Sequence, residues 1–316
     1  MSIAKGTILV TGANGGLGVA IANQIASEPE LAGFHGVYVV RDAAAPALRP
    51  ILATTSHSHE IVSMELTNLD SVRQAAGTIN TRIASGGIPP IQALILNAGF
   101  QDFGKQVWTE DGFDVTFSAN YLGQFLLTLL LLKSMNKDSG RIVLVGSEVH
   151  DPYDKRNEEG QVYTDDRYKT IVHDQAGFEA IARGTWSSAQ EDPSWRSGSR
   201  RYGAAKLFSI MMNDDGYDAP RVVVIRVLVF KIIYPVVAYL WPDGQVRSTQ
   251  KSASQVLRAA FDPSLGEFPK GLYFFDTKLL ETSAESKDQQ KRKMIWKESI
   301  RYAHVKEGET ILNDWQ

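Results

Sequence analysis

Ile8-Leu9-Val10-Thr11-Gly12-Ala13-Asn14-Gly15-Gly16-Leu17-Gly18 lies near the N-terminus and joins an apolar strand to a glycine-rich turn. Residues 19–27 continue in a helical pattern, so the turn stands between a strand and a helix. Glycines let the backbone turn tightly and approach a pyrophosphate, whose charge is favoured at a helix N-terminus. A tight turn without a ligand is the alternative. The spacing favours a nucleotide site that contains Gly12, Asn14, Gly16, Leu17 and Gly18.

A tyrosine and a lysine stand four residues apart in Tyr202-Gly203-Ala204-Ala205-Lys206. On a helix this spacing places both side chains on one face, so the ammonium can lie close to the phenol. Tyrosine ionises near pH ~10, and a nearby positive charge favours the phenolate. Ser147 ends the apolar segment Leu144-Val145-Gly146-Ser147 and could hold a substrate oxygen beside the phenol. The pattern predicts proton transfer by Tyr202 while a nicotinamide carries a hydride.

Strands and helices alternate along the chain, which predicts an α/β fold. Right-handed crossovers then give a Rossmann-like, doubly wound parallel sheet with helices on both faces, as three layers in a single domain over residues 1–316. The expected strands are 7–10, 37–40, 61–64, 93–96 and 142–145, and the expected helices include 17–27, 70–85, 111–135 and 200–212.

The composition is that of a folded enzyme. With 316 residues, 43% hydrophobic and 22% charged, the chain can bury one large core. A net charge of -3 offers no general attraction to nucleic acid or to an anionic membrane. The chain has no cysteine, and His150 and His173 show no ligand spacing, so we expect no metal. The start of the chain runs into the first strand without a secretory signal, which predicts a cytoplasmic protein.

Taken together, the motifs resemble those of the short-chain dehydrogenase/reductase family, in particular its retinol-dehydrogenase-like and protochlorophyllide-reductase-like branch of fungal type. The resemblance covers residues 5 to about 212 well and residues 248 to 303 less closely. The matching motifs, in the family's order, are Thr11-Gly12-x3-Gly16-Leu17-Gly18, Leu96-Asn97-Ala98-Gly99, Asn120 within Ser118–Gly123, Ser147, and Tyr202-x3-Lys206.

The resemblance implies a catalytic tetrad of Asn120, Ser147, Tyr202 and Lys206. In the family, the asparagine opens a helix carbonyl to a water that links the lysine to solvent, and the lysine also orients the cofactor ribose. The motif Asn97-Ala98-Gly99 would support the cofactor pocket. Taken singly, Asn120 could be a polar helix residue, Ser147 a turn serine and Lys206 a solvated cation.

Arg41 and Asp42 follow the second expected strand and bear on which nicotinamide cofactor is used. An acidic residue there accepts hydrogen bonds from the ribose of NAD, whereas a basic one pairs with the 2′-phosphate of NADP. Arg41 comes first, and the resemblance points the same way, so we expect NADP(H); a solvated loop cation is the alternative.

The family usually places an aspartate against the adenine after the third strand. Glu65 is the candidate here, with a surface glutamate as the alternative.

Residues 150–200 form an insertion that is longer than the compact members of the family carry. It is rich in tyrosine and tryptophan and contains the charged run Asp154–Glu159. Because it lies between Ser147 and Tyr202, we expect a cap near the substrate site. A partly disordered surface loop is the alternative.

The chain departs from the family pattern after Lys206. The resemblance implies a longer helix, a sixth strand, a Pro-Gly turn and a threonine that closes over the nicotinamide. Here the helix signals stop at Met212, residues 213–247 are atypical, and no Pro-Gly turn follows the β-branched stretch 221–229. A segment that carries the cofactor lid is therefore missing from the expected pattern.

The segment 225–241 is strongly apolar but is interrupted by Lys231 and Pro235. It falls short of the ~20 apolar residues of a spanning helix, so we expect no transmembrane span. An apolar substrate lid, a weak membrane contact and a core helix all remain open. Residues 271–275 are expected as the final strand and 283–298 as a charged closing helix.

These observations predict an NADP(H)-dependent oxidoreductase that interconverts a carbonyl and an alcohol on a small hydrophobic substrate. A place in secondary metabolism is implied by the resemblance to fungal chains. The alternative is a non-catalytic Rossmann protein that binds a cofactor or a partner because its lid segment is lost. The identity of the substrate and the oligomeric state stay open.

Overall fold

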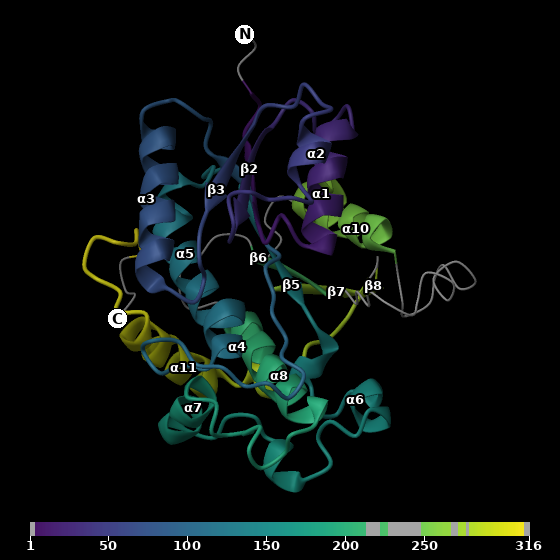
Figure 1. Ribbon diagram of the computed structural model, residues 1–316, viewed down its shortest axis with the longest axis vertical. Helices are drawn as coiled ribbons and strands as arrows, with labels where there is room; N and C mark the ends of the chain where they lie inside the picture. The colour runs from purple at the N-terminus through teal and green to yellow at the C-terminus, as the bar shows by residue number, and fades with distance from the viewer. Residues whose placement is uncertain (1–3, 213–221, 227–247, 267–270, 276–277, 313–316) are drawn as a thin grey trace.

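The computed structural model describes residues 4–212, 222–226, 248–266, 271–275 and 278–312. Their strands form one eight-stranded sheet in the order β3-β2-β1-β4-β5-β6-β7-β8 (Figure 1). Neighbouring strands are parallel except for β7 and β8, which run antiparallel. The strands are β1 Thr7–Thr11, β2 His35–Val40, β3 His59–Ser63, β4 Ile91–Leu96, β5 Arg141–Gly146, β6 Val222–Arg226, β7 Leu272–Phe275 and β8 Lys278–Leu279.

Helices cover both faces of the sheet, which confirms the doubly wound, three-layer α/β fold. Helices α1 (Gly16–Ser27) and α10 (Thr249–Phe261) pack together on one face (Figure 1). Helices α3 (Leu69–Ala84), α5 (Gly123–Leu131) and α8 (Trp195–Met211) cover the other face. Every residue of β1, β2 and β5 is buried, because a parallel sheet is enclosed on both sides. The five expected strands are all present, and their observed ends lie within two residues of the expected ones.

The expected helix 111–135 is a run of four helical segments between residues 115 and 134. These are α4 (Val115–Phe117), a π-helical turn (Ser118–Leu122), α5 and a 3₁₀ turn (Leu132–Ser134). The run begins at Val115 because the Asp114 carboxylate accepts the N–H groups of Thr116 and Phe117. By length and composition it could cross a membrane, but 94% of its apolar window is buried inside the fold. It serves here as a core helix against the sheet.

Helix α8, which carries Tyr202 and Lys206, begins at Trp195 rather than at residue 200. Ser194 caps it by accepting the N–H of Arg196. Its first turns contain serine and glycine, which have low helix propensity, so the sequence signal there is weak. Residues 195–200 of the predicted insertion therefore belong to α8.

The rest of the insertion is folded against α8 and forms the lower part of Figure 1. It contains α6 (Lys155–Glu159), a 3₁₀ turn (Asp166–Tyr168) and α7 (Gln175–Ala182). Val162, Tyr163 and Tyr168 form a small apolar cluster of their own. The Arg200 guanidinium of α8 lies 4.2 Å from the centre of the Tyr168 ring and donates to the Val162 carbonyl at 2.9 Å. The insertion is thus a packed part of the fold.

The C-terminal elements differ in detail from the expected ones. Strand β6 lies within the predicted stretch 221–229, but β7 is not the final strand, because β8 pairs with it. Helix α11 spans Gln289–Tyr302 rather than 283–298, because the Asp288 carboxylate caps it. The predicted absence of a Pro-Gly turn, and all but the start of the apolar stretch 225–241, lie outside the described residues.

Candidate active site

The glycine-rich turn lies at the C-terminal end of β1, where the strand order reverses between β2 and β4. Gly12 has a φ of +66°, and a Cβ there would lie 2.8 Å from the Ala98 Cα. A Cβ on Gly18 would lie 2.2 Å from the Gly12 carbonyl oxygen. No side chain caps the N-terminus of α1, so its first N–H groups can hold a phosphate. This cradle fits the pyrophosphate of a dinucleotide.

The end of β4 supports this turn through a buried hydrogen-bond network. The Asn97 side-chain amide donates to the Thr11 carbonyl at 2.8 Å, and the N–H groups of Asn97 and Ala98 donate to the Thr11 hydroxyl at 3.0 Å. Gln124 of α5 donates to the Ala98 carbonyl at 3.0 Å and accepts from the Thr11 hydroxyl at 3.3 Å. The sequence analysis missed the roles of Thr11 and Gln124. A glutamine within an apolar helix is the signal that could have found the latter.

Asn14 of the glycine-rich turn and Arg41, the first residue after β2, both lie beside the end of β2. The Asn14 side-chain oxygen accepts the N–H groups of Ala47 and Leu48 at 3.0 and 3.1 Å, which ties the turn to the loop after β2. Arg41 stands exposed at the tip of β2, and its guanidinium makes no hydrogen bond or ion pair with other described residues. It is therefore open to a phosphate beside that tip.

Glu65 follows β3 and closes a turn. One of its carboxylate oxygens accepts both the N–H and the hydroxyl of Thr67, at 3.0 and 2.9 Å. A contact of Glu65 with the adenine would have to come from the other carboxylate oxygen. The role of Glu65 at the adenine stays a prediction.

Asn120 lies in the π-helical turn and joins three segments. Its amide donates to the carbonyls of Phe100 and Thr116 at 2.6 and 2.7 Å, and its side-chain oxygen accepts the Phe100 N–H at 2.9 Å. A Cβ on Gly99 would lie 3.3 Å from that oxygen. The Asn120 carbonyl accepts the hydroxyl of Ser209 on α8 at 3.3 Å. A π turn loosens the regular helical bonding at such a carbonyl, and π turns recur at functional sites.

Ser147 directly follows β5 and begins a short 3₁₀ turn, Glu148–His150. Its hydroxyl oxygen lies 3.3 Å from a carboxylate oxygen of Glu148 and accepts the Val149 N–H at 3.4 Å. His150 is buried. It donates from Nδ1 to the Ser147 carbonyl at 2.7 Å and accepts the Ser283 N–H at Nε2 at 3.2 Å. This histidine fixes the backbone at Ser147.

Tyr202 and Lys206 share one face of α8, as the spacing predicts. The Lys206 ammonium lies 5.3 Å from the centre of the Tyr202 ring and donates to the Val145 carbonyl of β5 at 2.7 Å. Burial lowers the pKa of Lys206 to about 8. Burial also raises the pKa of Tyr202, and the charge of Glu148 raises it further. The expected lowering of the tyrosine pKa by Lys206 is not found.

A glycine allows α8 to approach the turn after Ser147. A Cβ on Gly203 would lie 2.4 Å from the Val149 carbonyl and 2.2 Å from the Tyr163 hydroxyl, which itself donates to that carbonyl at 2.6 Å. Ser147 lies at the C-terminal end of β5. Because α8 packs closely on the turn that follows, Tyr202 lies at the same end of the parallel strands.

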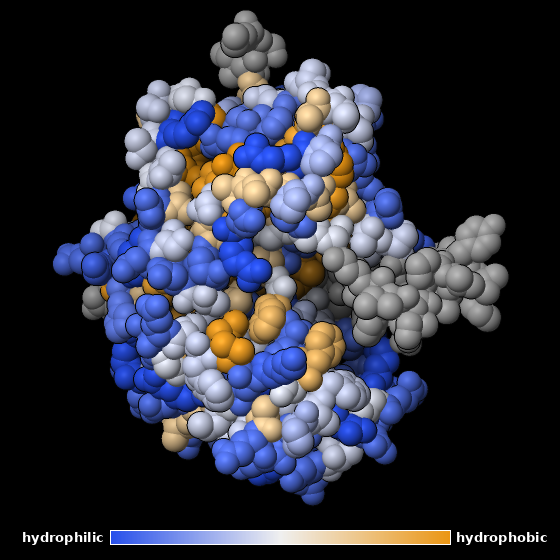
Figure 2. Space-filling model, viewed as in Figure 1, coloured by the Kyte–Doolittle hydropathy of each residue, from blue (hydrophilic) through white to orange (hydrophobic). Residues whose placement is uncertain are grey.

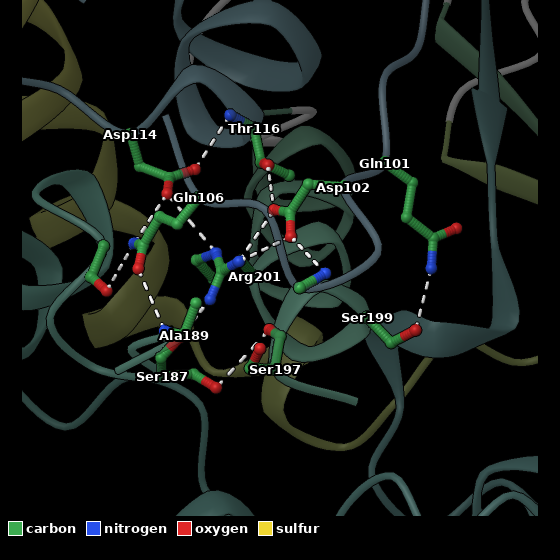
Figure 3. A network of polar contacts seen from close by, with 12 residues as sticks. Gln101, Asp102, Gln106, Asp114, Thr116, Ser187, Ala189, Ser197, Ser199 and Arg201 are labelled. Carbon is green, nitrogen blue, oxygen red and sulfur yellow. Dashed lines mark hydrogen bonds and ion pairs between the residues drawn. The ribbon is translucent and has the colours of Figure 1, made fainter. Parts of the chain in front are cut away.

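A buried ion network anchors α8 immediately before Tyr202 (Figure 3). Arg201 donates to both carboxylate oxygens of Asp102 at 2.7 Å, and its Nε lies 3.3 Å from Asp114. Arg201 also bonds to the Ser187 carbonyl of the insertion, and Gln106 donates to Asp114 at 2.9 Å. The network thereby joins the loop after β4, the N-terminus of α4, the insertion and α8.

Comparisons with known proteins agree with this geometry. The short chain dehydrogenase family model matches residues 6–163. Short-chain dehydrogenase iccH of Talaromyces variabilis is 40% identical over 99% of each chain. That match spans 363 aligned positions, 47 more than the 316 residues of this chain, so the relative contains segments that this chain lacks. Protochlorophyllide reductase B of Oryza sativa subsp. japonica is 27% identical, over 93% of this chain and 76% of its own length.

Solved structures share the fold at low identity. An uncharacterized protein from Mycobacterium paratuberculosis has a TM-score of 0.64 at 22% identity and covers 96% of each chain. Landomycin C-6 ketoreductase LanV, with bound NADP and rabelomycin, has a TM-score of 0.56 at 20% identity and covers 86% of this chain and 95% of its own. The family model, the full-length relative and the nucleotide cradle lead to one conclusion: this chain belongs to the short-chain dehydrogenase family and is an oxidoreductase of that family.

Proposed function

We propose that the chain uses NADP(H) to interconvert a carbonyl and an alcohol on a small hydrophobic substrate of secondary metabolism. The observation that carries the proposal is the placement of Ser147 and Tyr202 at one sheet edge, with the buried Lys206 behind the phenol. The structure of LanV, a ketoreductase with the same fold, holds NADP and the compound rabelomycin, which supports this class of activity.

Each side chain has a separate role in carbonyl reduction. The nicotinamide, when bound, supplies the hydride. Tyr202, a neutral phenol in this environment, donates its proton to the substrate oxygen as negative charge develops there. Ser147 donates a second hydrogen bond to the same oxygen. Lys206 holds the cofactor ribose, and Asn120 supports the path by which a proton returns to the site.

Arg41 supports the choice of NADP(H) over NAD(H). It is the first residue after β2, is exposed, and its guanidinium makes no hydrogen bond or ion pair with other described residues. A guanidinium there can form charge-assisted hydrogen bonds with a 2′-phosphate.

Exposed aromatic side chains support an apolar substrate. Phe100 adjoins Asn120 and is 40% exposed, Phe103 is 74% exposed on the same loop, and Trp195 at the start of α8 is 43% exposed. Figure 2 shows apolar residues that interrupt the hydrophilic surface between the sheet and the lower helices. Gln101 donates to Ser199 of α8 at 2.7 Å and fixes this loop beside the helix.

The direct test is Tyr202→Phe, which keeps the ring but removes the proton. We expect NADPH-dependent reduction to fall about 10²–10⁴-fold, the usual contribution of a general acid, while NADPH affinity stays near that of the unmodified chain. Turnover is followed by NADPH absorbance with a panel of aromatic ketones and quinones, and affinity by fluorescence titration. Normal turnover by this variant contradicts the proposed mechanism.

A second candidate is a cofactor-binding protein that does no chemistry. The extra aligned positions of the fungal relative favour it, because a lost segment could include the part that closes over the nicotinamide. A thermal shift with NADPH in the absence of turnover on the whole panel would favour this candidate. A ligand at 100 times its Kd adds about 2.7 kcal/mol, a shift of about 4 °C for a chain of this size.

A further inference from the structure

The side chain of Gln101, in the loop after β4, has one end of its carboxamide bonded and the other end open. Its nitrogen donates to the Ser199 hydroxyl of α8 at 2.7 Å. Its oxygen makes no hydrogen bond with the residues that the structure describes. Figure 3 shows this oxygen directed away from Ser199 and from Arg201. Because Gln101 is only half-buried, a small molecule can reach the open oxygen.

The backbone on both sides of Gln101 is fixed. On one side, the Phe100 N–H donates to the Asn120 side chain at 2.9 Å, and the Phe100 carbonyl accepts from it at 2.6 Å. On the other side, the buried Asp102 carboxylate accepts two hydrogen bonds from Arg201 at 2.7 Å. The bond to α8 therefore orients the carboxamide on a loop that is already held. An acceptor that is oriented in advance loses little conformational freedom when it binds a ligand.

The position of Gln101 relative to the reacting centre follows from the face of α8. Ser199 precedes Tyr202 by three residues and Lys206 by seven, so the three side chains follow one face of the helix. Lys206 donates to the Val145 carbonyl of β5 and marks the end of this face that meets the sheet. Gln101 is bonded at the opposite end. It therefore lies beyond Tyr202, where the part of a substrate behind its carbonyl would extend.

The sheet places the same loop beside the serine of the site. β4 and β5 are parallel neighbours, and the loop of Gln101 and the turn of Ser147 follow their C-terminal ends. Ligands of open α/β sheets bind at this edge. Phe100 and Phe103 are exposed on the loop of Gln101. The open oxygen is thus a polar group next to apolar side chains, as in sites that bury an apolar ligand and fix its orientation through a few polar contacts.

We propose that Gln101, oriented by Ser199, determines substrate specificity by accepting a hydrogen bond from a hydroxyl group of the substrate. An amide oxygen accepts from a hydroxyl but gains no hydrogen bond from an ether oxygen or a carbonyl. Side chains three residues apart on a helix have Cβ atoms about 5–6 Å apart, so the hydroxyl and the reacting carbonyl belong on opposite sides of a small ring system. The substrate class is a hydroxylated aromatic ketone. This inference deepens the proposed function and rests on it.

The test compares the isomeric 2-tetralones that carry one hydroxyl on the aromatic ring, each with its methyl ether and with unsubstituted 2-tetralone. In the unmodified chain, kcat/KM for the best hydroxylated isomer should exceed that for both comparison ketones about tenfold, the effect of one hydrogen bond. Gln101→Leu removes the acceptor at similar volume, and this ratio should fall to about one. The absence of a preference in the unmodified chain overturns the proposal. A preference that persists in Gln101→Leu also overturns it, even if all rates fall together, because Gln101 then only supports the loop.

Two further variants complete the test. Ser199→Ala removes the hydroxyl that orients the carboxamide, so the preference for the hydroxylated ketone should fall severalfold. An unchanged preference in this variant overturns the proposal even if Gln101→Leu does not fold. Gln74→Leu makes the same change of side chain at an exposed position of α3 and is the matched control, which should keep the full preference.

A measurement without turnover separates this inference from the proposed function. Failure to reduce any of these ketones, or normal reduction by Tyr202→Phe, counts against the proposed function. Calorimetric titration of the same ketones into the chain saturated with NADP⁺, which cannot give a hydride to a ketone, then decides the inference. A Kd about tenfold lower for the hydroxylated ketone than for its ether, with the difference lost in Gln101→Leu, supports it. Equal Kd values in the unmodified chain overturn it.

Discussion

The two halves of the active site are held together by different kinds of interaction. The cofactor half is a backbone cradle in which Gly12 and Gly18 allow close approach and Asn97 ties the turn to β4. The catalytic half depends on charged side chains, because Arg201 is buried between Asp102 and Asp114 beside Tyr202. A backbone turn has no charge to desolvate, whereas a buried ion network is favourable only while each member keeps its partner. Single substitutions should therefore cost most in the catalytic half.

The largest effect is expected for Asp102→Ala. The change leaves the buried Arg201 guanidinium without the carboxylate that accepts two of its hydrogen bonds, so the free energy of unfolding should fall by about 3–5 kcal/mol. Urea denaturation measures the loss. Asp138→Ala, at an exposed carboxylate in a turn, is the control and should stay within about 0.5 kcal/mol. A loss below about 1 kcal/mol for Asp102→Ala would show that the network does not hold this half together.

Acid should act through His57, which bonds to Tyr38 of β2, the neighbour of β1 in the sheet. Burial, reinforced by the charges of His59 and His35, lowers the pKa of His57 from 6.5 to about 4, and its Nε2 lies 3.0 Å from the buried Tyr38 hydroxyl. Between these two values the unfolded chain binds the proton and the folded chain does not. Stability is thus complete above pH 6.5 and is lost as the pH falls toward 4, by up to about 3 kcal/mol.

Urea titrations at several pH values check this, with His57→Gln and His173→Gln compared. His173 is exposed, so its variant should keep the acid dependence, whereas His57→Gln should reduce it. Equal acid dependence in both variants would assign the effect to other groups.

In the glycine cradle, Gly18→Ala places a methyl group 2.2 Å from the Gly12 carbonyl. We expect a loss of about 1–3 kcal/mol from overpacking, together with a loss of NADPH binding as the turn shifts. Gly77→Ala is the matched control, because nothing lies within 4 Å of its Cβ on α3; it should raise stability by about 0.5–1 kcal/mol. Thermal melts with and without NADPH report both effects. NADPH binding that survives Gly18→Ala would count against the cradle.

The smallest effect is expected for Arg41→Ala. Loss of one charge-assisted contact should weaken NADPH about tenfold, equivalent to about 1.4 kcal/mol, and leave NADH unaffected. Isothermal titration with both nucleotides measures the ratio. Equal weakening of the two would show that Arg41 does not contact a 2′-phosphate.

The sequence predicted the cofactor half better than the catalytic half. The cradle and its support are local in the chain, because Gly12 to Gly18 and Asn97 to Gly99 are contiguous motifs at strand ends. The partners of the catalytic half are not. Asp102 and Arg201 are separated by 99 residues, and no local pattern pairs them. The start of α8 at Trp195 was missed for a related reason, because its serine and glycine residues are stabilised by tertiary contacts rather than by helix propensity.

By itself, the sequence determined the doubly wound α/β fold, the glycine-rich turn and the shared helix face of Tyr202 and Lys206, because periodicity and short spacings encode strands, helices and helix faces. The tertiary structure decided the electrostatics. Burial, which the sequence does not state residue by residue, raises the pKa of Tyr202 and lowers the pKa of Lys206, and the fold places Glu148 beside Ser147. Charge and proton position depend on which groups meet in space, and only the folded chain brings those groups together.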